Sequence, residues 1–346
     1  MKEKLAKEIC DKAIEYGYDK CGIIPITDIE GFEEALNKRI ETFPESEDEL
    51  NVLKHYAHPE EEFPWAKSVI ICSYSIGKFN IPQNLEGKIS KSYLVDGRRE
   101  KNSQQYQAHE KFQEYLNSKG LKAETGTDFD LTTMRWFAAK SGIGIIRKNN
   151  FLYTEDGSYV SLQSWLIDEN LEYRVKSDLK ECPEKCTRCI DMCPTKSLTN
   201  DYATNKMKCI SWITCKHKNN LTEEPLHEQL GEWIYGCDVC QDVCPLNNRK
   251  WVGGEEFPGL EEFADKVSLI KIVDMSYDDL ASIVQPKLWY VTTDDLWRFK
   301  VNALNSMLNN WKVEYGSIVD KACKDSNEKV RVMAEFVKSN INIGKK

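Results

Sequence analysis

Apolar residues recur at helical spacing in two stretches of the first half of the chain. Over residues 1–18 single apolar positions alternate with lysine and glutamate up to Gly17, which predicts an amphipathic surface helix that stops there. A second set runs from Tyr106 to Leu116 and ends before Gly120. Both segments therefore predict helices with one buried and one solvated face.

Short apolar runs between these segments have the length and composition of buried strands. A long acidic stretch from 41 to 62 predicts a loop region instead. The predicted strands are the apolar runs at residues 21–24 and 68–74 and, after the second helix, residues 159–167, where apolar and polar positions alternate. Alternating helices and strands up to about residue 175 indicate a mixed α and β unit.

The second half of the chain has a different pattern. From about residue 265 onward the periodicity is helical, and the stretches 296–311 and 315–340 predict a helix-pair repeat of the HEAT type. The predicted fold class is thus α+β, with three units: an α/β domain over 1–175, a cysteine-rich module over 176–250 and a helical HEAT-like domain over 251–346.

Composition places the protein among globular cytoplasmic proteins. Its 346 residues are 41% hydrophobic, enough for a core of ordinary size. No run approaches the roughly 18 apolar residues of a membrane span, and the N-terminal helix does not resemble a signal peptide. Thirteen cysteines without export indicate a reducing compartment, where thiols serve as metal ligands more often than as disulfides.

The charge is unevenly distributed. A net charge of −9 argues against nucleic-acid binding over the whole surface. Residues 297–346, however, contain ten Lys or Arg against five acids. This local excess fits either a solvated helical surface or a phosphate-binding one.

Eight of the thirteen cysteines fall into two runs, and each run ends in Cys-Pro. The first run holds Cys182, Cys186, Cys189 and Cys193; the second holds Cys209, Cys237, Cys240 and Cys244. This spacing is typical of two cubane iron–sulfur clusters, in which the cysteine before proline crosses to the other cluster. Zinc is the alternative, since C-x-x-C pairs also build four-cysteine zinc sites, but zinc sites do not call for the repeated Cys-Pro ending.

The remaining cysteines have no evident place in the clusters. Cys215 is a surplus thiol six residues after Cys209. The other four lie on apolar patterns and are predicted to be small core residues: Cys10, Cys21, Cys72 and Cys323.

The segment 233–245, which contains Tyr-Gly-Cys-Asp-Val-Cys-Gln-Asp-Val-Cys-Pro, strongly resembles the epoxyqueuosine reductases. These are cobalamin-dependent enzymes whose core is related to reductive dehalogenases. The resemblance implies an N-terminal cobalamin-binding α/β domain, a bacterial-ferredoxin-like module with two 4Fe-4S clusters, and the HEAT-like tail. It also implies a base-off cobalamin, a tRNA substrate, and a low-potential electron donor such as ferredoxin or flavodoxin.

A second similar segment, 138–149, aligns the substrate half with that family. The resemblance places Asp128 at the catalytic aspartate. It assigns cofactor or pocket contacts to Arg135, His109, Lys148, Asn149, Gly157 and Ser158. This chain departs from the family segment at Leu131, Met134, Arg147 and Ala108, all in the substrate and cofactor half.

Each assignment has a plainer alternative. Asp128 and Asp130 could cap a helix that begins near Thr132. His109 lies on an apolar stripe, where a core histidine is common. Lys148 and Asn149 could shape a turn.

Reducing an epoxide to an alkene and water consumes two electrons and two protons. Low-potential clusters could supply the electrons to cobalt, and Asp128, desolvated beneath a corrin, could stay protonated and act as the acid. Arg135 could hold a substrate oxygen or a cofactor side chain with its fork of donors. No D-x-H-x-x-G run occurs, so the sequence offers no lower-ligand histidine for the cobalt.

Two further functions remain open at this stage. A paralogous enzyme could reduce a small organic molecule such as an organohalide. Alternatively, the protein could be a non-catalytic electron carrier, although a carrier needs little beyond the cysteine-rich module.

Overall fold

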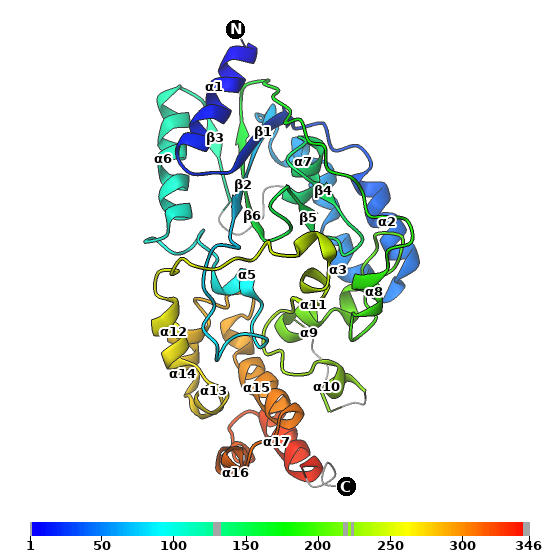
Figure 1. Cartoon of the computed structure of the whole chain (residues 1–346), viewed down its shortest axis with the longest axis vertical. Coiled ribbons are helices and arrows are strands. Elements are labelled where there is room, and N and C mark those ends of the chain that lie inside the picture. The colour runs from blue at the N-terminus through cyan, green and yellow to red at the C-terminus, as the bar shows by residue number, and fades with distance from the viewer. Residues whose placement is uncertain (1, 127–132, 217–220, 223–224, 342–346) are drawn as a thin grey trace.

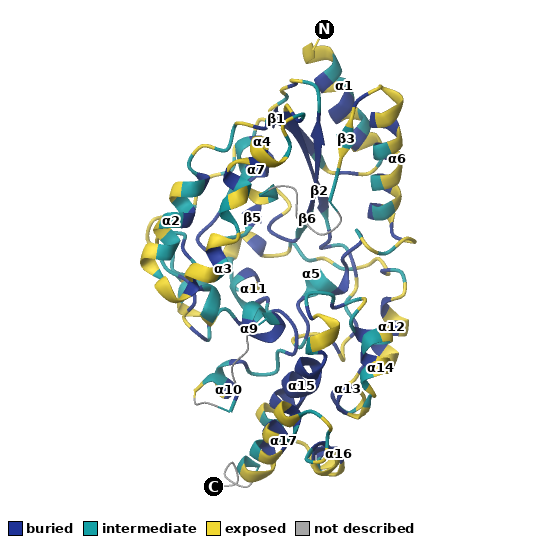
Figure 2. Ribbon diagram, turned by 180° about the vertical axis from the view of Figure 1, so that it is seen from behind, coloured by how far each residue is buried: buried dark blue, intermediate teal, exposed yellow. Residues whose placement is uncertain are grey.

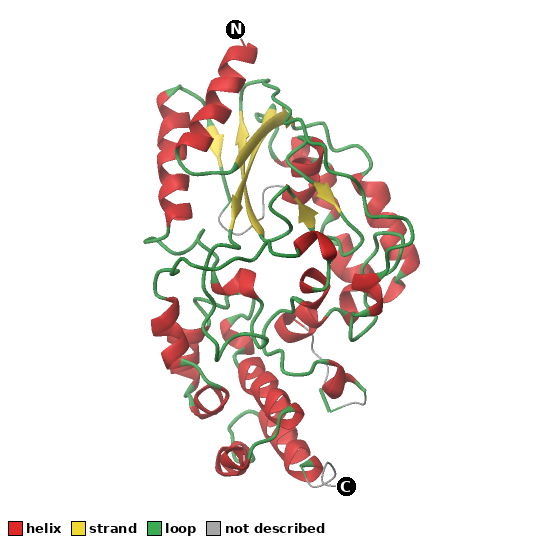
Figure 3. Ribbon diagram, viewed as in Figure 1, coloured by secondary structure: helices red, strands yellow, loops and turns green. Residues whose placement is uncertain are grey.

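The computed structural model describes residues 2–126, 133–216, 221–222 and 225–341. Its strands gather in the N-terminal half, while helices and long loops build the rest (Figures 1 and 3). Helix α1 begins the chain at one end, and the C-terminal helices lie at the opposite end. This arrangement confirms a mixed helix and sheet fold.

A four-stranded antiparallel sheet forms the centre of the N-terminal half, in the order β1-β2-β6-β3. The three longer strands confirm the predicted apolar runs, because each is almost wholly buried. The strands are β1 (Lys20–Pro25), β2 (Ser68–Ser75), β6 (Val160–Ile167) and β3 (Ala123–Glu124). A separate pair joins β4 (Ile145–Ile146) and β5 (Leu152–Tyr153).

Helices cover both faces of this sheet. The predicted helices are present as α1 (Lys2–Glu15) and α6 (Gln104–Ser118), and both pack on the face that carries Trp165. Helix α7 (Met134–Lys140) packs on the other face, against Leu166 and its neighbours. Successive residues of a strand point to opposite faces, which assigns the two helix layers to opposite sides of the sheet.

The acidic stretch 41–62 was wrongly predicted to be a loop. It forms four short helical turns that follow α2 (Phe32–Thr42). Pro44 and Pro59 stand at first helical positions, and glutamates occupy the first turns, which suits the positive end of the helix dipole. The turns are η1 (Pro44–Ser46), α3 (Glu47–Asn51), η2 (Lys54–Ala57) and α4 (Pro59–Glu62).

The cysteine-rich region is built from short helices joined by loops. A small helix α5 (Lys91–Leu94) from the N-terminal half reaches this region, because Ser90 Oγ and the Lys91 amide donate to the Asp238 carboxylate at 2.6 and 2.8 Å. The elements are α8 (Arg188–Asp191), η3 (Lys206–Lys208), α9 (Ile210–Lys216), α10 (Leu226–Gln229), α11 (Val239–Asp242) and η4 (Pro245–Asn247).

The C-terminal region is helical, and the predicted stretch 315–340 is divided in two. Asn327 caps the second of these helices by accepting from the Lys329 amide at 2.9 Å. The helices are α12 (Leu260–Lys266), α13 (Leu269–Asp274), α14 (Tyr277–Asp279), α15 (Trp297–Asn309), α16 (Gly316–Ala322) and α17 (Glu328–Asn340). The connecting turns are η5 (Leu280–Val284), η6 (Thr293–Asp295) and η7 (Val313–Tyr315).

Helix α15 is the buried centre of the C-terminal region (Figure 2). One cluster of buried hydrophobic residues extends from Ala6 in α1 to Val337 in α17. The three-unit division and the HEAT-like repeat therefore stay predictions. Among the described residues, none of the helices is both long and apolar enough to cross a membrane.

Candidate metal centre and active site

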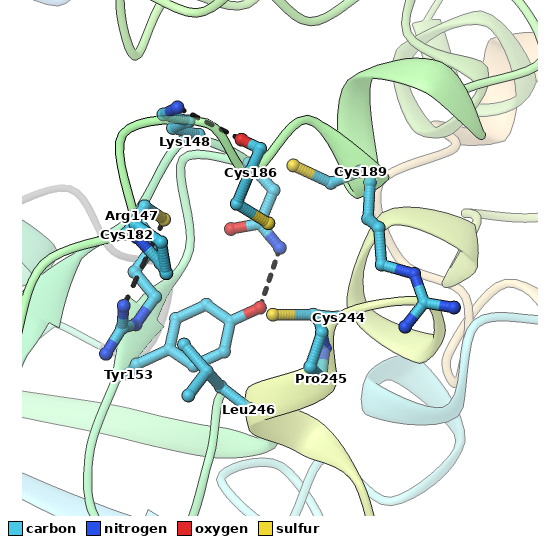
Figure 4. A pocket seen from close by; sticks show the side chains of 12 residues that line it. Arg147, Lys148, Tyr153, Cys182, Cys186, Cys189, Cys244, Pro245 and Leu246 are labelled. Atoms are coloured by element: carbon cyan, nitrogen blue, oxygen red, sulfur yellow. Dashed lines mark hydrogen bonds between the residues drawn. The ribbon is translucent and has the colours of Figure 1, made fainter.

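Four thiols from two distant segments of the chain line one cavity of about 100 Å³. Cys182, Cys186 and Cys189 come from the loop before α8 and its first turn, and Cys244 follows α11. Figure 4 shows the sulfur atoms of Cys186, Cys189 and Cys244 turned toward the cavity. Sulfurs arranged around a space suit a multinuclear cluster, because a single zinc ion draws all four to about 2.3 Å from one point.

The other four cysteines form a second group. Burial raises the pKa of the Cys240 thiol well above its usual value, and the nearby thiols of Cys237, Cys209 and Cys193 raise it further. The Ser197 amide donates to Cys193 Sγ at 3.3 Å. Across the ranges that the structure describes, no three His, Cys, Asp or Glu side chains are placed to hold a single metal ion.

Lys148 and Asn149 hold the backbone of the cysteine loops. The Lys148 ammonium donates to the Glu184 and Cys186 carbonyls at 2.9 and 3.0 Å, and Asn149 Nδ2 donates to the Cys240 carbonyl at 3.0 Å. Both side chains are buried. The structure thus places these two residues beside the cluster thiols, as supports of the loops that carry them.

Gly157 and Ser158 also contact the cysteine-rich region. The Ser158 amide donates to Asn247 Oδ1 at 2.8 Å, and its hydroxyl donates to Gln241 Oε1 at 2.8 Å. Gly157 has a φ of +89°, and a Cβ there would lie 2.6 Å from the same Asn247 oxygen. Sequence reasoning missed Asn247 and Gln241; the signal available was their position within three residues of Cys244.

Arg135 is the second residue of α7. Its Nη1 donates to the Asn150 carbonyl, and part of the side chain remains exposed. The surrounding protein nevertheless lowers the pKa of its guanidinium by desolvation. Arg135 therefore offers an accessible cation within a crowded part of the molecule.

Two more cations lie near Arg135. Burial and, to a smaller extent, the Arg135 charge lower the pKa of Arg39 in α2 to about 10. Arg39 Nη2 lies 3.5 Å from the Thr204 carbonyl, and its buried Nε has no partner in the described part of the chain. Lys206 stands two residues after Thr204, with its ammonium 3.9 Å from the centre of the Trp212 ring and 3.1 and 3.8 Å from the carbonyl and carboxylate oxygens of Glu49. These three cations form a donor-rich corner close to Cys209.

His109 lies away from this corner. Its ring stacks on Trp165 with ring centres 5.3 Å apart, on the sheet face that α1 and α6 cover. Burial lowers the pKa of the imidazole. Helix α7 and Arg135 belong to the opposite layer, so the structure does not bring these two predicted pocket residues together.

Asp128, Asp130 and Leu131 lie outside the described residues. The chain that leads to them is anchored by Gln163 on β6, whose Nε2 donates to Thr125 Oγ1 at 2.7 Å and to the Gly126 carbonyl at 3.1 Å. The catalytic assignment of Asp128 therefore rests on the sequence.

Comparison with known proteins adds an independent line of evidence. Residues 181–247 match the family described as a 4Fe-4S double cluster binding domain. The chain is 30% identical over 303 residues to the epoxyqueuosine reductase of Cellulophaga algicola, a match that covers 86% of this chain and 91% of that protein. It is 31% identical over 271 residues to that of Cyclobacterium marinum, covering 71% of this chain and 80% of that protein.

Solved structures give the same fold. A Bacillus subtilis epoxyqueuosine reductase, with its catalytic aspartate loop swung out of the active site, superposes with a TM-score of 0.76 at 23% identity, covering 96% of this chain and 89% of that one. An epoxyqueuosine reductase bound to an epoxyqueuosine-modified stem loop of tyrosine tRNA gives a TM-score of 0.73 at 23% identity, covering 98% and 90%.

Proposed function

The chain belongs to the epoxyqueuosine reductase family, and from this premise we propose that it reduces epoxyqueuosine in tRNA to queuosine. The observation that carries the proposal is the pair of crossed cysteine sets, with Cys244 joining Cys182, Cys186 and Cys189 around one cavity. Such an arrangement serves electron transfer. The similarity to relatives over most of the chain indicates epoxyqueuosine as the substrate.

Two 4Fe-4S clusters fit the residues present. Cys182, Cys186, Cys189 and Cys244 would hold one cluster, and Cys193, Cys209, Cys237 and Cys240 would hold the other. A ferredoxin or flavodoxin would deliver electrons one at a time. When bound, these clusters and a base-off cobalamin supply the two electrons that convert the epoxide to an alkene.

The donor-rich corner is better suited to bind the polar groups of a cobalamin than to pack as an apolar core. Arg39 and Arg135 present guanidinium groups without a carboxylate partner among the described residues, and Arg39 Nε is buried without an acceptor. The amide oxygens and phosphodiester of a corrinoid accept hydrogen bonds from such groups. Arg135 and Arg39 would therefore orient the cofactor, whereas His109 would not contact it.

Asp128 would supply a proton to the epoxide oxygen. The reaction takes up two protons and releases water, so an acid must stand at the oxygen that leaves. Exclusion of water by a corrin would raise the pKa of the Asp128 carboxyl and keep it protonated near neutral pH. Gln163 would position this acid, because it anchors Thr125 and Gly126 directly before the segment.

The C-terminal helices would bind tRNA through few of their cations. Lys300, Lys321 and Lys338 are already paired with Asp325, Asp274 and Asp320. Lys312, Lys324 and Lys329 form no ion pair with an acid in the described ranges and are left for phosphates. Contacts this few predict weak binding to RNA in general, so recognition would depend on the modified anticodon loop itself.

An anaerobic cobalamin titration of the iron-reconstituted protein tests the cofactor requirement. We expect a base-off absorbance spectrum that saturates at about one corrin per chain. Tight corrin binding without tRNA binding would indicate a paralogue that reduces a small molecule. Absence of any spectral change would contradict the proposal and favour the alternative that the protein is a non-catalytic electron carrier.

A further inference from the structure

Arg147 is a buried cation in the wall of the first cluster cavity. It follows β4 directly, and only 4% of the residue is exposed. Its Nη1 lies 4.0 Å from Cys182 Sγ, and its guanidinium carbon lies 5.1 Å from the centre of the Tyr153 ring. Figure 4 shows the guanidinium below Cys182 and beside Tyr153, on the wall of the cavity.

This cation has no counter-charge among the described protein groups. Arg147 forms no ion pair with a carboxylate there, and its buried Nε has no hydrogen-bond partner. A buried, unpaired guanidinium is strongly unfavourable. Four thiolates and the inorganic sulfides of a cluster would supply both the missing negative charge and the missing acceptors.

The other cations of the cavity do not have this property. The Lys148 ammonium is engaged by the Glu184 and Cys186 carbonyls and by Asn200 Oδ1, at 2.9, 3.0 and 3.3 Å. Arg188 also lines the cavity, but it is exposed, so water and salt screen its charge. Arg147 is thus the buried cation of this cavity whose guanidinium N–H groups remain available to donate to the sulfur atoms of a cluster.

We propose that Arg147 is the built-in counter-charge of the cluster held by Cys182, Cys186, Cys189 and Cys244, and that it raises the reduction potential of this cluster. Reduction adds one electron to a group that is already negative. A fixed positive charge in a water-poor site stabilises the reduced form more than the oxidised form. The inference rests on the clusters of the proposed function but on neither cobalamin nor tRNA.

The second cluster has different surroundings. Among the described residues, no arginine donates to the sulfur of Cys193, Cys209, Cys237 or Cys240. The Ser197 amide and the Thr195 hydroxyl, which lie 3.3 and 3.7 Å from Cys193 Sγ, are neutral. A contact between a buried cation and a ligand sulfur is therefore a feature of the first cluster, and removal of Arg147 should change the potential of that cluster alone.

Redox titration of the full chain with both clusters reconstituted, followed by electron paramagnetic resonance, tests this inference. The matched variants are Arg147→Gln and Arg188→Gln, which each remove one positive charge from the same cavity. We expect Arg147→Gln to move the midpoint potential of one cluster to a lower value and leave the other near wild type. Arg188→Gln should move the same midpoint by less, because its charge is screened.

Equal midpoints in wild type and Arg147→Gln, or an equal shift in both variants, would overturn the inference. Should Arg147→Gln fail to hold the cluster, Arg147→Lys keeps the charge and decides the question. Its midpoint should lie near wild type, and a shift as large as that expected on charge removal would overturn the inference. The titration contains no cobalamin and no tRNA, so its failure leaves epoxyqueuosine reduction untouched, and failed turnover leaves this inference untouched.

Discussion

At the scale of single residues, the thiols separate clearly into ligands and core. The Cys-Pro endings indicated the crossing of Cys244 into the first group, and the cavity contains it. Cys215 is different: it is buried, and burial raises its pKa to about 12. The Thr214 hydroxyl lies 3.9 Å from its sulfur, and the Gly236 amide donates to that hydroxyl at 3.0 Å. A protonated thiol satisfied by its own loop is a poor ligand.

Replacing Cys244, which comes from the second cysteine run and joins the first group, should therefore prevent one cluster from assembling. We predict that Cys244→Ala lowers the iron content of the reconstituted protein by about half, because one of the two four-thiolate sets is broken. Cys215→Ala should keep the wild-type iron content and absorbance. Equal iron loss in both variants would show that the ligand sets are wrongly assigned.

The acid assignment predicts a selective loss. Asp128→Asn should abolish conversion of epoxyqueuosine while cluster absorbance and cobalamin binding stay at wild-type levels, because an amide cannot donate the proton. Asp130→Asn, two residues away, is the matched control and should retain turnover. Full activity of Asp128→Asn under saturating reductant would refute the assignment.

At the scale of elements, the buried parts were the predictable ones. Strands β1 and β2 carry short apolar runs, β6 alternates over part of its length, and α1 and α6 carry regular stripes, so local pattern sufficed. The turns over 41–62 were missed because their stability depends on capping prolines and on docking, not on periodicity. The loop-supporting role of Lys148 was missed because its partners are 36 and 38 residues away in sequence.

The contact between Gly157 and Asn247 joins the N-terminal half of the chain to the cysteine-rich region. We predict that Gly157→Ala destabilises the fold by more than the about 1–2 kcal/mol of a left-handed residue, because the new methyl group also displaces Asn247. Gly87→Ala provides the control, since Gly87 has a φ of +70° and nothing within 4 Å of its Cβ position. Urea unfolding should rank Gly157→Ala as clearly the less stable, and equal losses would contradict this role.

The pair of Lys300 and Asp325 is the polar centre of the C-terminal helices. The ammonium lies 2.8 Å from the carboxylate, and their side chains are 6% and 9% exposed. Burial opposes ionisation of Asp325, but bonds from Lys300, the Asn327 amide and Tyr277 outweigh it, so the carboxyl pKa lies below its usual value. Asp325→Asn should therefore cost about 3–5 kcal/mol, because it leaves Lys300 buried and unpaired.

The pH dependence of this loss has a definite sign. A lowered folded-state pKa stabilises the protein above the unfolded carboxyl pKa of about 4, and this stabilisation is lost as the pH falls through the folded-state value. The gap in unfolding free energy between wild type and Asp325→Asn should thus be constant near neutral pH and shrink in acid. A gap that widens on acidification would contradict the pairing.

At the scale of the whole molecule, the C-terminal helices are tied to the cluster region. Asn302 Nδ2 of α15 donates to the Thr214 and Ile234 carbonyls at 2.9 Å each, and these residues lie within five positions of Cys209 or Cys237. This contact could not be predicted from the sequence, because an asparagine side chain that donates to backbone carbonyls leaves neither a hydrophobic periodicity nor a charge pattern. A tRNA bound by the C-terminal helices would consequently be held in a fixed position relative to the clusters.

Anaerobic turnover is the measurement that decides whether this chain reduces epoxyqueuosine. Protein with both clusters and cobalamin is mixed with epoxyqueuosine-containing tRNA and a low-potential reductant, and the modified nucleosides are separated after digestion. We expect conversion to queuosine that requires both cobalamin and reductant. Unchanged epoxyqueuosine with fully loaded protein and bound tRNA would contradict it.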